Sequence, residues 1–279
     1  MDYASLKALY DSHGQAHVFE HFETLDPQQQ TALLRQAAGI DLDELDQLVE
    51  IHVRQEAVAG IDFEKLEPAP YLPHFRNGGD AEQWQHARET GEQALRDGRV
   101  GVFTVAGGQG TRLGYDAPKG TFPVTPVSHA SLFEVFAAKL RCAARLYGKD
   151  LHWFIMTSDV NHDQTVRFFE QKNYLGLRAD KVHFFRQGLM PAVDFNGKLI
   201  LESPGSLAMS PDGHGGSLRA LYRSGSTRIM RENGIDLLSY FQVDNPLVKC
   251  VDPYFIGFHI LGNSEMSGKA LPKAYPGEK

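Results

Sequence analysis

The sequence predicts an α/β protein with an open, largely parallel β-sheet that is covered by helices on both faces. Two observations lead to this fold class. Apolar runs short enough to be buried strands occur at 100–106, 151–156, 181–185 and 237–243, and stretches with helical spacing lie between the first three. Glycine and polar residues follow these runs directly, at the positions where ligands bind in parallel sheets.

Residues 1–98 are expected to form a helical N-terminal segment before the sheet-forming part, 99–279. Leucine and aromatic residues recur there at helical spacing, and Asp26-Pro27 is typical of a helix start. A stretch rich in proline and glycine at 67–79 indicates a linker. A further helix is expected to begin at Asp80 and to run to Gly98.

Three histidines, His13, His17 and His21, are spaced four apart in this segment. On a continuous helix they would lie along one face. Ligands spread over two turns do not converge easily on one ion, and Gly14 interrupts the run. We therefore expect a solvated stripe on a surface helix rather than a metal site.

The stretch 100–120 combines a predicted strand with a loop suited to bind an anion. Four glycines fall within eight residues: Gly107, Gly108, Gly110 and Gly114. They allow close backbone approach and let N–H groups face a ligand. Arg112 adds a planar fork of donors, and Lys119 a compact positive charge. The loop does not match a Walker A motif, because Tyr115 rather than lysine follows the last glycine. It does not match the dinucleotide motif G-x-G-x-x-G either, because its last glycine comes one position too late. A polyphosphate cradle of another kind is predicted.

The elements after the loop continue the alternation of strand and helix. Ser131 and Glu134 form a capping box at the start of a helix, and another helix begins near Val166. The turn 211–216 carries His214 between glycines, where an exposed loop histidine is the simplest interpretation. The last apolar run ends at Asp244. A carboxylate at a strand end suits Mg²⁺ bound together with a substrate phosphate, although aspartate also commonly caps a helix or a turn.

Composition excludes several classes of protein. Hydrophobic residues make up 42% and charged residues 23%, as in ordinary soluble globular proteins. The net charge of −7 argues against a nucleic-acid-binding surface. We see no long apolar run or signal peptide, so no membrane partner is expected. Cys142 and Cys250 lie in apolar segments and are predicted to be buried thiols, which favours a cytoplasmic protein.

Residues 106–114, Ala-Gly-Gly-Gln-Gly-Thr-Arg-Leu-Gly, followed by Pro118-Lys119, resemble the signature loop of nucleoside-diphosphate-sugar pyrophosphorylases. The narrower resemblance is to the eukaryotic-type UDP-sugar pyrophosphorylases, above all the UDP-N-acetylglucosamine enzymes. Four further segments occur in the order of that family: 155–158, 184–188, 211–216 and 243–249. The resemblance implies a Rossmann-like nucleotidyltransferase core in which Mg²⁺, UTP and a sugar 1-phosphate give a UDP-sugar and pyrophosphate.

The resemblance also implies roles for individual residues. UTP would contact Val105, Ala106, Gly107, Gly108, Lys119, Gln187 and Gly213. Gln187 and Gly213 would read the uracil, His214 would touch the sugar phosphate, and Asp244 would ligate Mg²⁺. Because the attacking phosphate is already an anion, catalysis should depend on positioning and charge neutralisation, in which Arg112 and Lys119 act as the catalytic cations.

Two departures from the family leave alternatives open. His214 stands where the N-acetylglucosamine enzymes usually have asparagine and is closer to the UDP-glucose enzymes, whereas Gly215-Gly216 and Gln187-Gly188 are closer to the former. The chain also ends before the segments that supply most sugar contacts in the family, so the core is expected to be incomplete. Three hypotheses follow: a UDP-N-acetylglucosamine-forming uridylyltransferase, a UTP–glucose-1-phosphate uridylyltransferase, and a truncated chain that binds UTP without turnover. The sequence does not indicate an oligomeric state.

Overall fold

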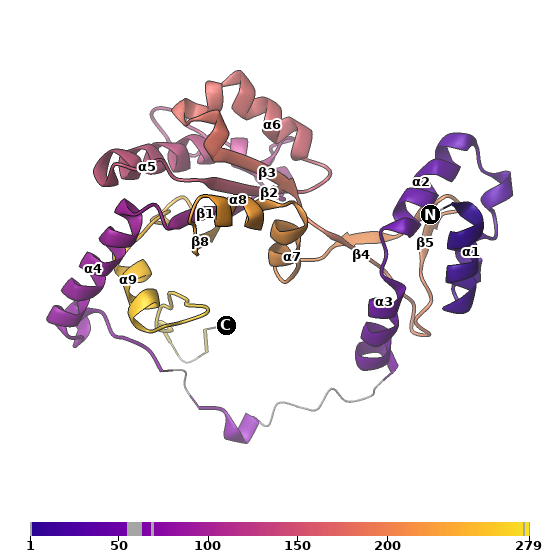
Figure 1. Ribbon diagram of the computed structural model, residues 1–279, viewed down its shortest axis with the longest axis horizontal. Coiled ribbons are helices and arrows are strands. Elements are labelled where there is room, and N and C mark those ends of the chain that lie inside the picture. Colours follow the sequence, from indigo (N-terminus) through magenta and orange to yellow (C-terminus); the bar gives the residue numbers. More distant parts are fainter. Residues whose placement is uncertain (1, 55–62, 68–69, 276, 279) are drawn as a thin grey trace. The chain divides into compact units, whose positions relative to one another are not determined.

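The computed structural model describes residues 2–54, 63–67, 70–275 and 277–278 (Figure 1). By their internal contacts the residues divide into two compact units. One unit comprises residues 1–69 and 188–213, and the other comprises residues 70–187 and 214–279. We call them the helical unit and the sheet unit. No helix in the described ranges is long and apolar enough to cross a membrane.

The sheet unit contains a four-stranded parallel sheet, as predicted. Its strands are β1 (Val100–Val105), β2 (Trp153–Thr157), β3 (Val182–Arg186) and β8 (Leu237–Gln242), in the order β3-β2-β1-β8. In the centre, Thr104 of β1 lies opposite Ile155 of β2 and Phe241 of β8. All neighbouring strands run parallel, so their carboxyl ends share one edge.

Helices cover both faces of this sheet because successive strand residues point to opposite sides. On one face, Val102, Trp153 and Ile155 pack against α5 (Leu132–Tyr147) and α6 (His162–Gln171). On the other, Phe103, Phe154 and Met156 pack against α7 (Gly216–Arg223) and α8 (Ser226–Glu232). The α/β class with helices on both faces is therefore confirmed.

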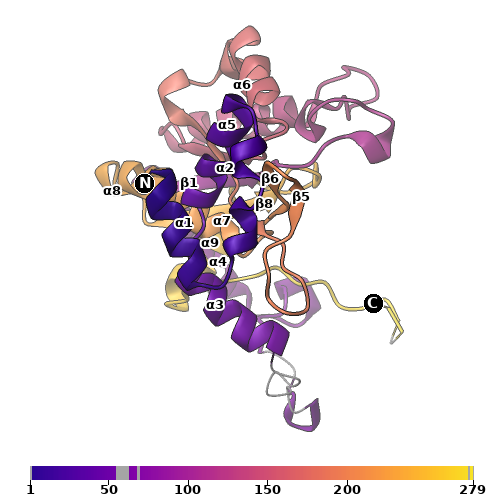
Figure 2. The same ribbon diagram turned by 90° about the vertical axis from the view of Figure 1, so that its right-hand side faces the viewer.

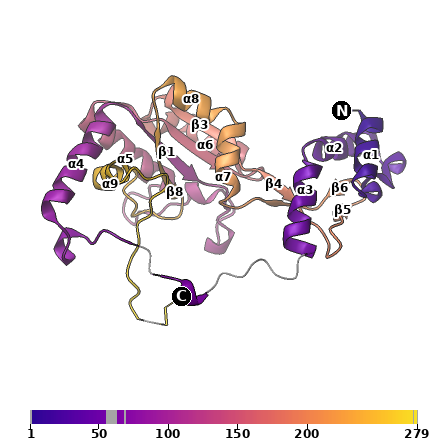
Figure 3. The same ribbon diagram turned by 60° about the horizontal axis from the view of Figure 1, so that its bottom comes forward.

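Two helices that are distant in sequence, α4 (Ala81–Arg96) and α9 (Pro253–Leu261), pack with their backbones in contact (Figure 3). A Cβ atom on Gly91 would lie 1.9 Å from the carbonyl oxygen of Pro253, and one on Gly257 would lie 1.6 Å from that of Ala87. Only glycine fits at these two positions. Helix α4 thus belongs to the sheet unit, although residues up to 98 were expected to form a separate helical segment.

The helical unit contains α1 (Tyr3–Ser12), α2 (Pro27–Ala38) and α3 (Leu42–Val49) (Figure 2). Two short antiparallel strand pairs belong to it as well. These pairs are β4 (Leu189–Pro191) with β7 (Met209–Pro211), and β5 (Leu201–Ser203) with β6 (Ser206–Leu207). Leu199 and Leu207 join the core formed by the N-terminal helices. The segment 188–213 therefore belongs with the N-terminus, a division that differs from the expected boundary after residue 98.

Single-turn elements complete the chain. A π-helical turn at Glu50–Arg54 follows α3. The remaining turns are 3₁₀ helices: Ala16–Phe19, Phe22–Thr24, Phe63–Lys65, Phe75–Asn77, Thr111–Leu113, Lys119–Thr121, Asn173–Gly176 and Ala179–Lys181. The predicted linker 67–79 includes residues 68–69, which lie outside the described part.

Two local expectations are wrong. The three histidines do not share one helix, because α1 ends at Ser12 and the chain turns at Gly14 with φ +68°. The Nδ1 atom of His13 lies 2.7 Å from Asp46 instead, and Nε2 of His17 lies 2.7 Å from the carbonyl oxygen of Leu199. Within the described ranges, no three His, Cys, Asp or Glu side chains are grouped to hold a metal.

The second wrong expectation concerns the cysteines. Cys250 is a buried thiol, as predicted, but Cys142 is exposed. The buried face of α5 consists of Leu132, Phe133, Phe136, Ala137, Leu140 and Ala143, and Cys142 lies off this face. The apolar segment around Cys142 is therefore only half buried.

Candidate functional site

The predicted site residues of the sheet unit follow the strands at their common carboxyl edge. The glycine loop follows β1, Ser158 follows β2, Gln187 follows β3 and Asp244 follows β8 closely. Since the strands are parallel and in register, these four places lie along one edge of the sheet. The fold therefore brings together residues that are far apart in sequence.

The glycine loop folds back on itself through backbone hydrogen bonds. The N–H of Gly110 donates to Ala117 over 2.9 Å, and the N–H of Lys119 donates to the carbonyl of Gly108 over 3.1 Å. The chain reverses at Gly114 with φ +66°, a conformation that favours glycine. Lys119 is thereby returned to the start of the loop, where a Cβ on Gly108 would lie 3.6 Å from its Nζ atom.

Gly107 lies at the crowded part of the loop. A Cβ atom there would come within 3.1 Å of Oε1 of Gln187 and 3.5 Å of the backbone nitrogen of Ser158. The N–H of Gln187 donates to Thr157 over 2.7 Å, which extends the pairing of β2 and β3 by one residue. The structure thus places Gln187 beside Gly107, the arrangement that a shared ligand would require.

Lys119 and Asp244 form an ion pair at the same edge, with 3.2 Å between Nζ and Oδ2. The lysine side chain is 25% exposed and the carboxylate 50%, so both charges remain accessible to a ligand. A hard divalent cation such as Mg²⁺ is commonly held by one or two carboxylates plus substrate phosphates. The donor set here, one accessible carboxylate next to an anion-binding loop, fits that mode of binding.

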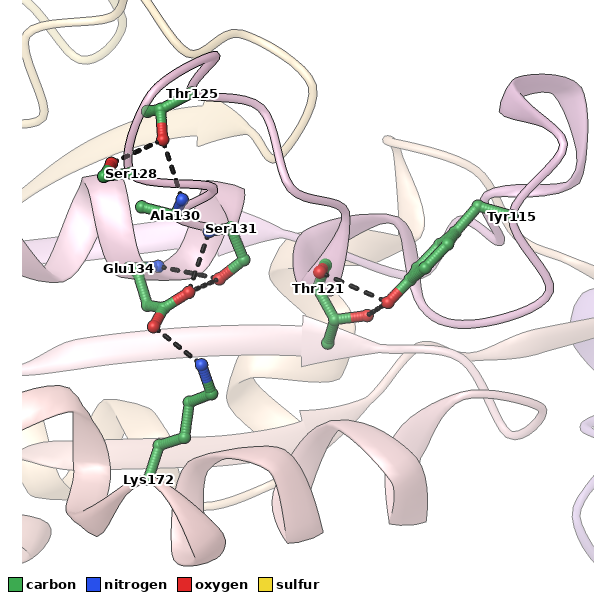
Figure 4. A network of polar contacts seen from close by, with 8 residues as sticks. All are labelled: Tyr115, Thr121, Thr125, Ser128, Ala130, Ser131, Glu134 and Lys172. Carbon is green, nitrogen blue, oxygen red and sulfur yellow. Dashed lines mark hydrogen bonds and ion pairs between the residues drawn. The ribbon is translucent and has the colours of Figure 1, made fainter.

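A polar network fixes the chain between the loop and α5 (Figure 4). The hydroxyl of Tyr115 lies 3.0 Å from Oγ1 of Thr121. Glu134 accepts from the backbone of Ser131 at 2.8 Å and from Lys172 at 2.7 Å. Burial alone would raise the pKa of Glu134, but the bonds from Lys172 and Ser131 outweigh it and lower that pKa. The predicted capping box is confirmed, and it anchors the segment that follows Lys119.

Arg112 lies in the 3₁₀ turn Thr111–Leu113, and its side chain is exposed. Across the described ranges, its guanidinium makes no hydrogen bond or ion pair with another residue. The structure leaves it open to solvent, so its role as a catalytic cation stays a prediction.

His214 is the first residue of the sheet unit after the chain returns from the helical unit, just before α7. Its Nδ1 atom is hydrogen-bonded to the hydroxyl of Tyr240 on β8, and its carbonyl accepts from Ser217 at 2.6 Å. Burial raises the pKa of Tyr240, so the phenol stays protonated and is able to donate to Nδ1. Nε2 would then carry the imidazole proton. Gly213, with φ +67°, belongs by its contacts to the helical unit, and its contact with the uracil stays a prediction.

Sequence reasoning missed Asn161, which is fully buried at 0% exposure beside the loop. Its carboxamide nitrogen donates to the carbonyls of Ala106 at 2.9 Å and Gly108 at 3.2 Å. Its carboxamide oxygen accepts from the backbone of Ser158 at 2.9 Å. A polar residue shortly after a predicted strand end was the available signal, but in sequence it indicates only a helix cap.

Comparison with known proteins gives consistent matches. A family model described as UTP–glucose-1-phosphate uridylyltransferase matches residues 42–275. UDP-N-acetylglucosamine diphosphorylase 2 of Arabidopsis thaliana is 35% identical over 282 residues, which cover 96% of this chain and 55% of that protein. UDP-N-acetylglucosamine pyrophosphorylase of Saccharomyces cerevisiae is 33% identical over 281 residues, covering 96% and 58%.

Solved structures agree with these matches. The crystal structure of uridine diphosphate N-acetylglucosamine pyrophosphorylase from Trypanosoma brucei, in complex with an inhibitor, superposes with a TM-score of 0.77 at 28% identity. The superposition covers 93% of this chain and 54% of that one. This chain spans about half the length of the relatives that it matches.

Proposed function

The chain belongs to the UTP–glucose-1-phosphate uridylyltransferase family, and on this premise we propose that it binds UTP and serves the transfer of a uridylyl group to a sugar 1-phosphate. The products are a UDP-sugar and pyrophosphate. The family that the loop sequence resembles is thereby confirmed, whereas the reaction, its substrates and its use of Mg²⁺ are our proposals. The two free cysteines suit a reducing compartment, and we propose the cytosol.

The proposed reaction is an in-line displacement at phosphorus. An oxygen of the sugar 1-phosphate forms a bond to the α-phosphorus of UTP. The bond from that phosphorus to the bridging oxygen breaks, and its electron pair leaves with pyrophosphate. No proton has to move, because the nucleophile is already anionic. The task of the protein is to hold two anions together and to neutralise their charge.

The residues of the site divide this task. The loop amides and Lys119 would bind the phosphates, Gln187 would contact the uracil, and His214 would donate from Nε2 to the sugar phosphate. Asp244 would hold Mg²⁺, which when bound supplies positive charge to the phosphate oxygens. Arg112 is exposed within the loop and would add a second cation to the phosphates.

One observation carries the proposal: Lys119 and Asp244 are paired at 3.2 Å next to Gly108. The accessible lysine next to the glycine loop can bind a phosphate, and the accessible carboxylate paired with it can bind a metal ion. Mg²⁺–UTP offers each of them a partner of opposite charge, so both charges are used at once.

For the sugar we propose N-acetylglucosamine 1-phosphate, because the curated relatives are named for N-acetylglucosamine. A pocket that pairs an acetamido group leaves polar groups unmet when glucose binds, so discrimination can be large. The second candidate is glucose 1-phosphate, which His214 favours because this residue is the feature closest to the UDP-glucose enzymes.

Calorimetric titration of the chain with UTP, with and without MgCl₂, tests the proposal. We expect Mg²⁺-dependent binding that Lys119→Ala weakens about tenfold or more, the usual effect of losing a charge-assisted hydrogen bond. Lys149→Ala, which removes an exposed lysine just after α5, is the matched control and should bind normally. A wild-type chain that does not bind Mg²⁺–UTP would refute the proposal. Pyrophosphate release with each sugar 1-phosphate in turn distinguishes the two sugars.

A further inference from the structure

We infer that Asn161 is a positioning residue for the nucleotide site. Its buried carboxamide holds two carbonyl groups of the glycine loop toward itself and so directs the N–H groups of the same peptides toward the phosphates. The inference rests on the proposed function. It assigns a task to a residue outside the glycine motif, on the neighbouring strand–helix connection.

The geometry follows from the planarity of the peptide bond. The carbonyls of Ala106 and Gly108 both accept hydrogen bonds from Nδ2 of Asn161. The loop contains no cis peptide, and in a trans peptide the N–H points away from the C=O. The N–H groups of Gly107 and Gln109 are therefore directed away from Asn161. Neither donates a hydrogen bond to any other described residue, so both are available to an anion.

The other half of the carboxamide ties this arrangement to the sheet. Oδ1 of Asn161 accepts from the N–H of Ser158, the first residue after β2. The side chain thereby joins the end of β2 to the loop that follows β1. Since it is buried, these bonds are shielded from water and the loop cannot exchange them for solvent.

The position of Asn161 in the chain shows what it does not do. It occupies the N-cap position of α6, where asparagine commonly accepts a bond from the first turn of the helix. Here the side chain makes no such bond. Within the described ranges, its side chain is hydrogen-bonded to Ala106, Gly108 and Ser158 instead, so the cap of α6 does not explain the residue.

Two variants separate positioning from folding. Asn161→Asp keeps the shape and the acceptor for Ser158 but replaces the donor with an oxygen that repels the two carbonyls. Asn161→Ser retains a hydroxyl donor and should recover part of the function. Thr165→Val is the matched control, because Thr165 is equally buried on α6 and its hydroxyl has no hydrogen-bond partner.

The probes are UTP, inorganic tripolyphosphate and uridine, each titrated with Mg²⁺ into the whole chain. Asn161→Asp should bind UTP and tripolyphosphate about tenfold or more weakly and uridine as the wild type does. Amide hydrogen exchange should be faster in residues 106–110 than in the wild type. Thr165→Val should bind all three normally.

Each outcome has a definite meaning. Unchanged tripolyphosphate affinity in Asn161→Asp would overturn the inference while leaving the proposed function intact. An equal loss for uridine and UTP, accompanied by a lower melting temperature, would show a merely structural role and also overturn it. A wild-type chain that binds neither UTP nor tripolyphosphate would refute the proposed function itself and this inference with it.

Discussion

Acid should destabilise the sheet unit through His152, which lies just before β2 and is 6% exposed. Nδ1 of His152 lies 2.9 Å from Nε2 of His183, and its Nε2 lies 2.8 Å from Nζ of Lys181. If the ammonium donates to Nε2, the proton of the neutral imidazole resides on Nδ1 and points at His183. A second proton would have to displace the lysine and add a positive charge beside it.

The pKa of His152 reflects this environment. Burial, the charge of Lys181 and the neighbouring His183 lower it from 6.5 to about 4, and Asn233 and Asp180 oppose the shift. The pKa of His183 is lowered as well, first by burial and then by Lys181. Between pH 6.5 and 4, His152 is therefore protonated in the unfolded chain but stays neutral in the folded chain. Stability is highest above this window and falls as the pH decreases through it.

The size of the effect follows from linkage. A pKa difference of this size amounts to about 3 kcal/mol when both states are fully titrated. Between pH 7 and pH 5, only the unfolded state takes up the proton to a large extent, and about 2 kcal/mol of the free energy of unfolding should be lost through His152 alone. That is a large share of the stability of an ordinary domain.

Urea unfolding followed by tryptophan fluorescence measures this loss, because Trp153 is the buried neighbour of His152. Carboxylates contribute to acid denaturation too, so the quantity to compare is the difference between pH 7 and pH 5 in wild type and in His152→Gln. The variant should lose about 2 kcal/mol less. His86→Gln, which removes an exposed histidine of α4, should behave as the wild type. An equal loss in wild type and His152→Gln would show the reasoning to be wrong.

Three further predictions follow from the packing and the site. Gly257→Ala should lower the free energy of unfolding by about 1–3 kcal/mol or more, because its Cβ would lie 1.6 Å from the carbonyl oxygen of Ala87. Urea unfolding measures this loss, and a urea midpoint equal to that of the wild type would contradict the close contact. Asp244→Asn should raise the Mg²⁺ concentration needed for UTP binding about tenfold; an unchanged Mg²⁺ titration would leave Asp244 as a cap. Tyr240→Phe should weaken UDP-N-acetylglucosamine binding several-fold while UTP affinity is kept, since His214 loses its Nδ1 partner; equal affinities for the UDP-sugar would remove the pair from the sugar site.

The sheet could be predicted from sequence because each strand is a short apolar run. The predicted run 237–243 and the observed β8, Leu237–Gln242, differ by one residue, and the other strands differ by two at most. Once the strands are known to be parallel, the rule that their carboxyl ends share one edge also predicts that the start of the glycine loop, Gln187 and Asp244 lie along the same edge. These predictions depend on local pattern and on one general property of parallel sheets.

What the sequence could not reveal depends on contacts without a local pattern. Gln15 is buried because it bonds Gly197 and Leu199, and nothing near residue 15 indicates those partners. The same holds for Asn161, because its sequence position indicates only a helix cap and nothing nearby indicates its partners in the glycine loop. The exposure of Cys142 is different: the helical period of Phe133, Phe136 and Leu140 already placed it away from the buried face.

The glycine contact between α4 and α9 also matters while the protein is being made. The face of α4 that carries Ala87, Gly91 and Leu95 is buried in the finished fold, and α9 covers part of it. At a translation rate of about 5–20 residues per second, α9 leaves the ribosome roughly ten to thirty seconds after α4. During that interval α4 has α5 as a neighbour but lacks α9, so the part of its face that α9 covers is open to chaperones and to other nascent chains. The synthesis of α9, rather than the formation of α4 itself, therefore decides when this face of α4 is protected from aggregation.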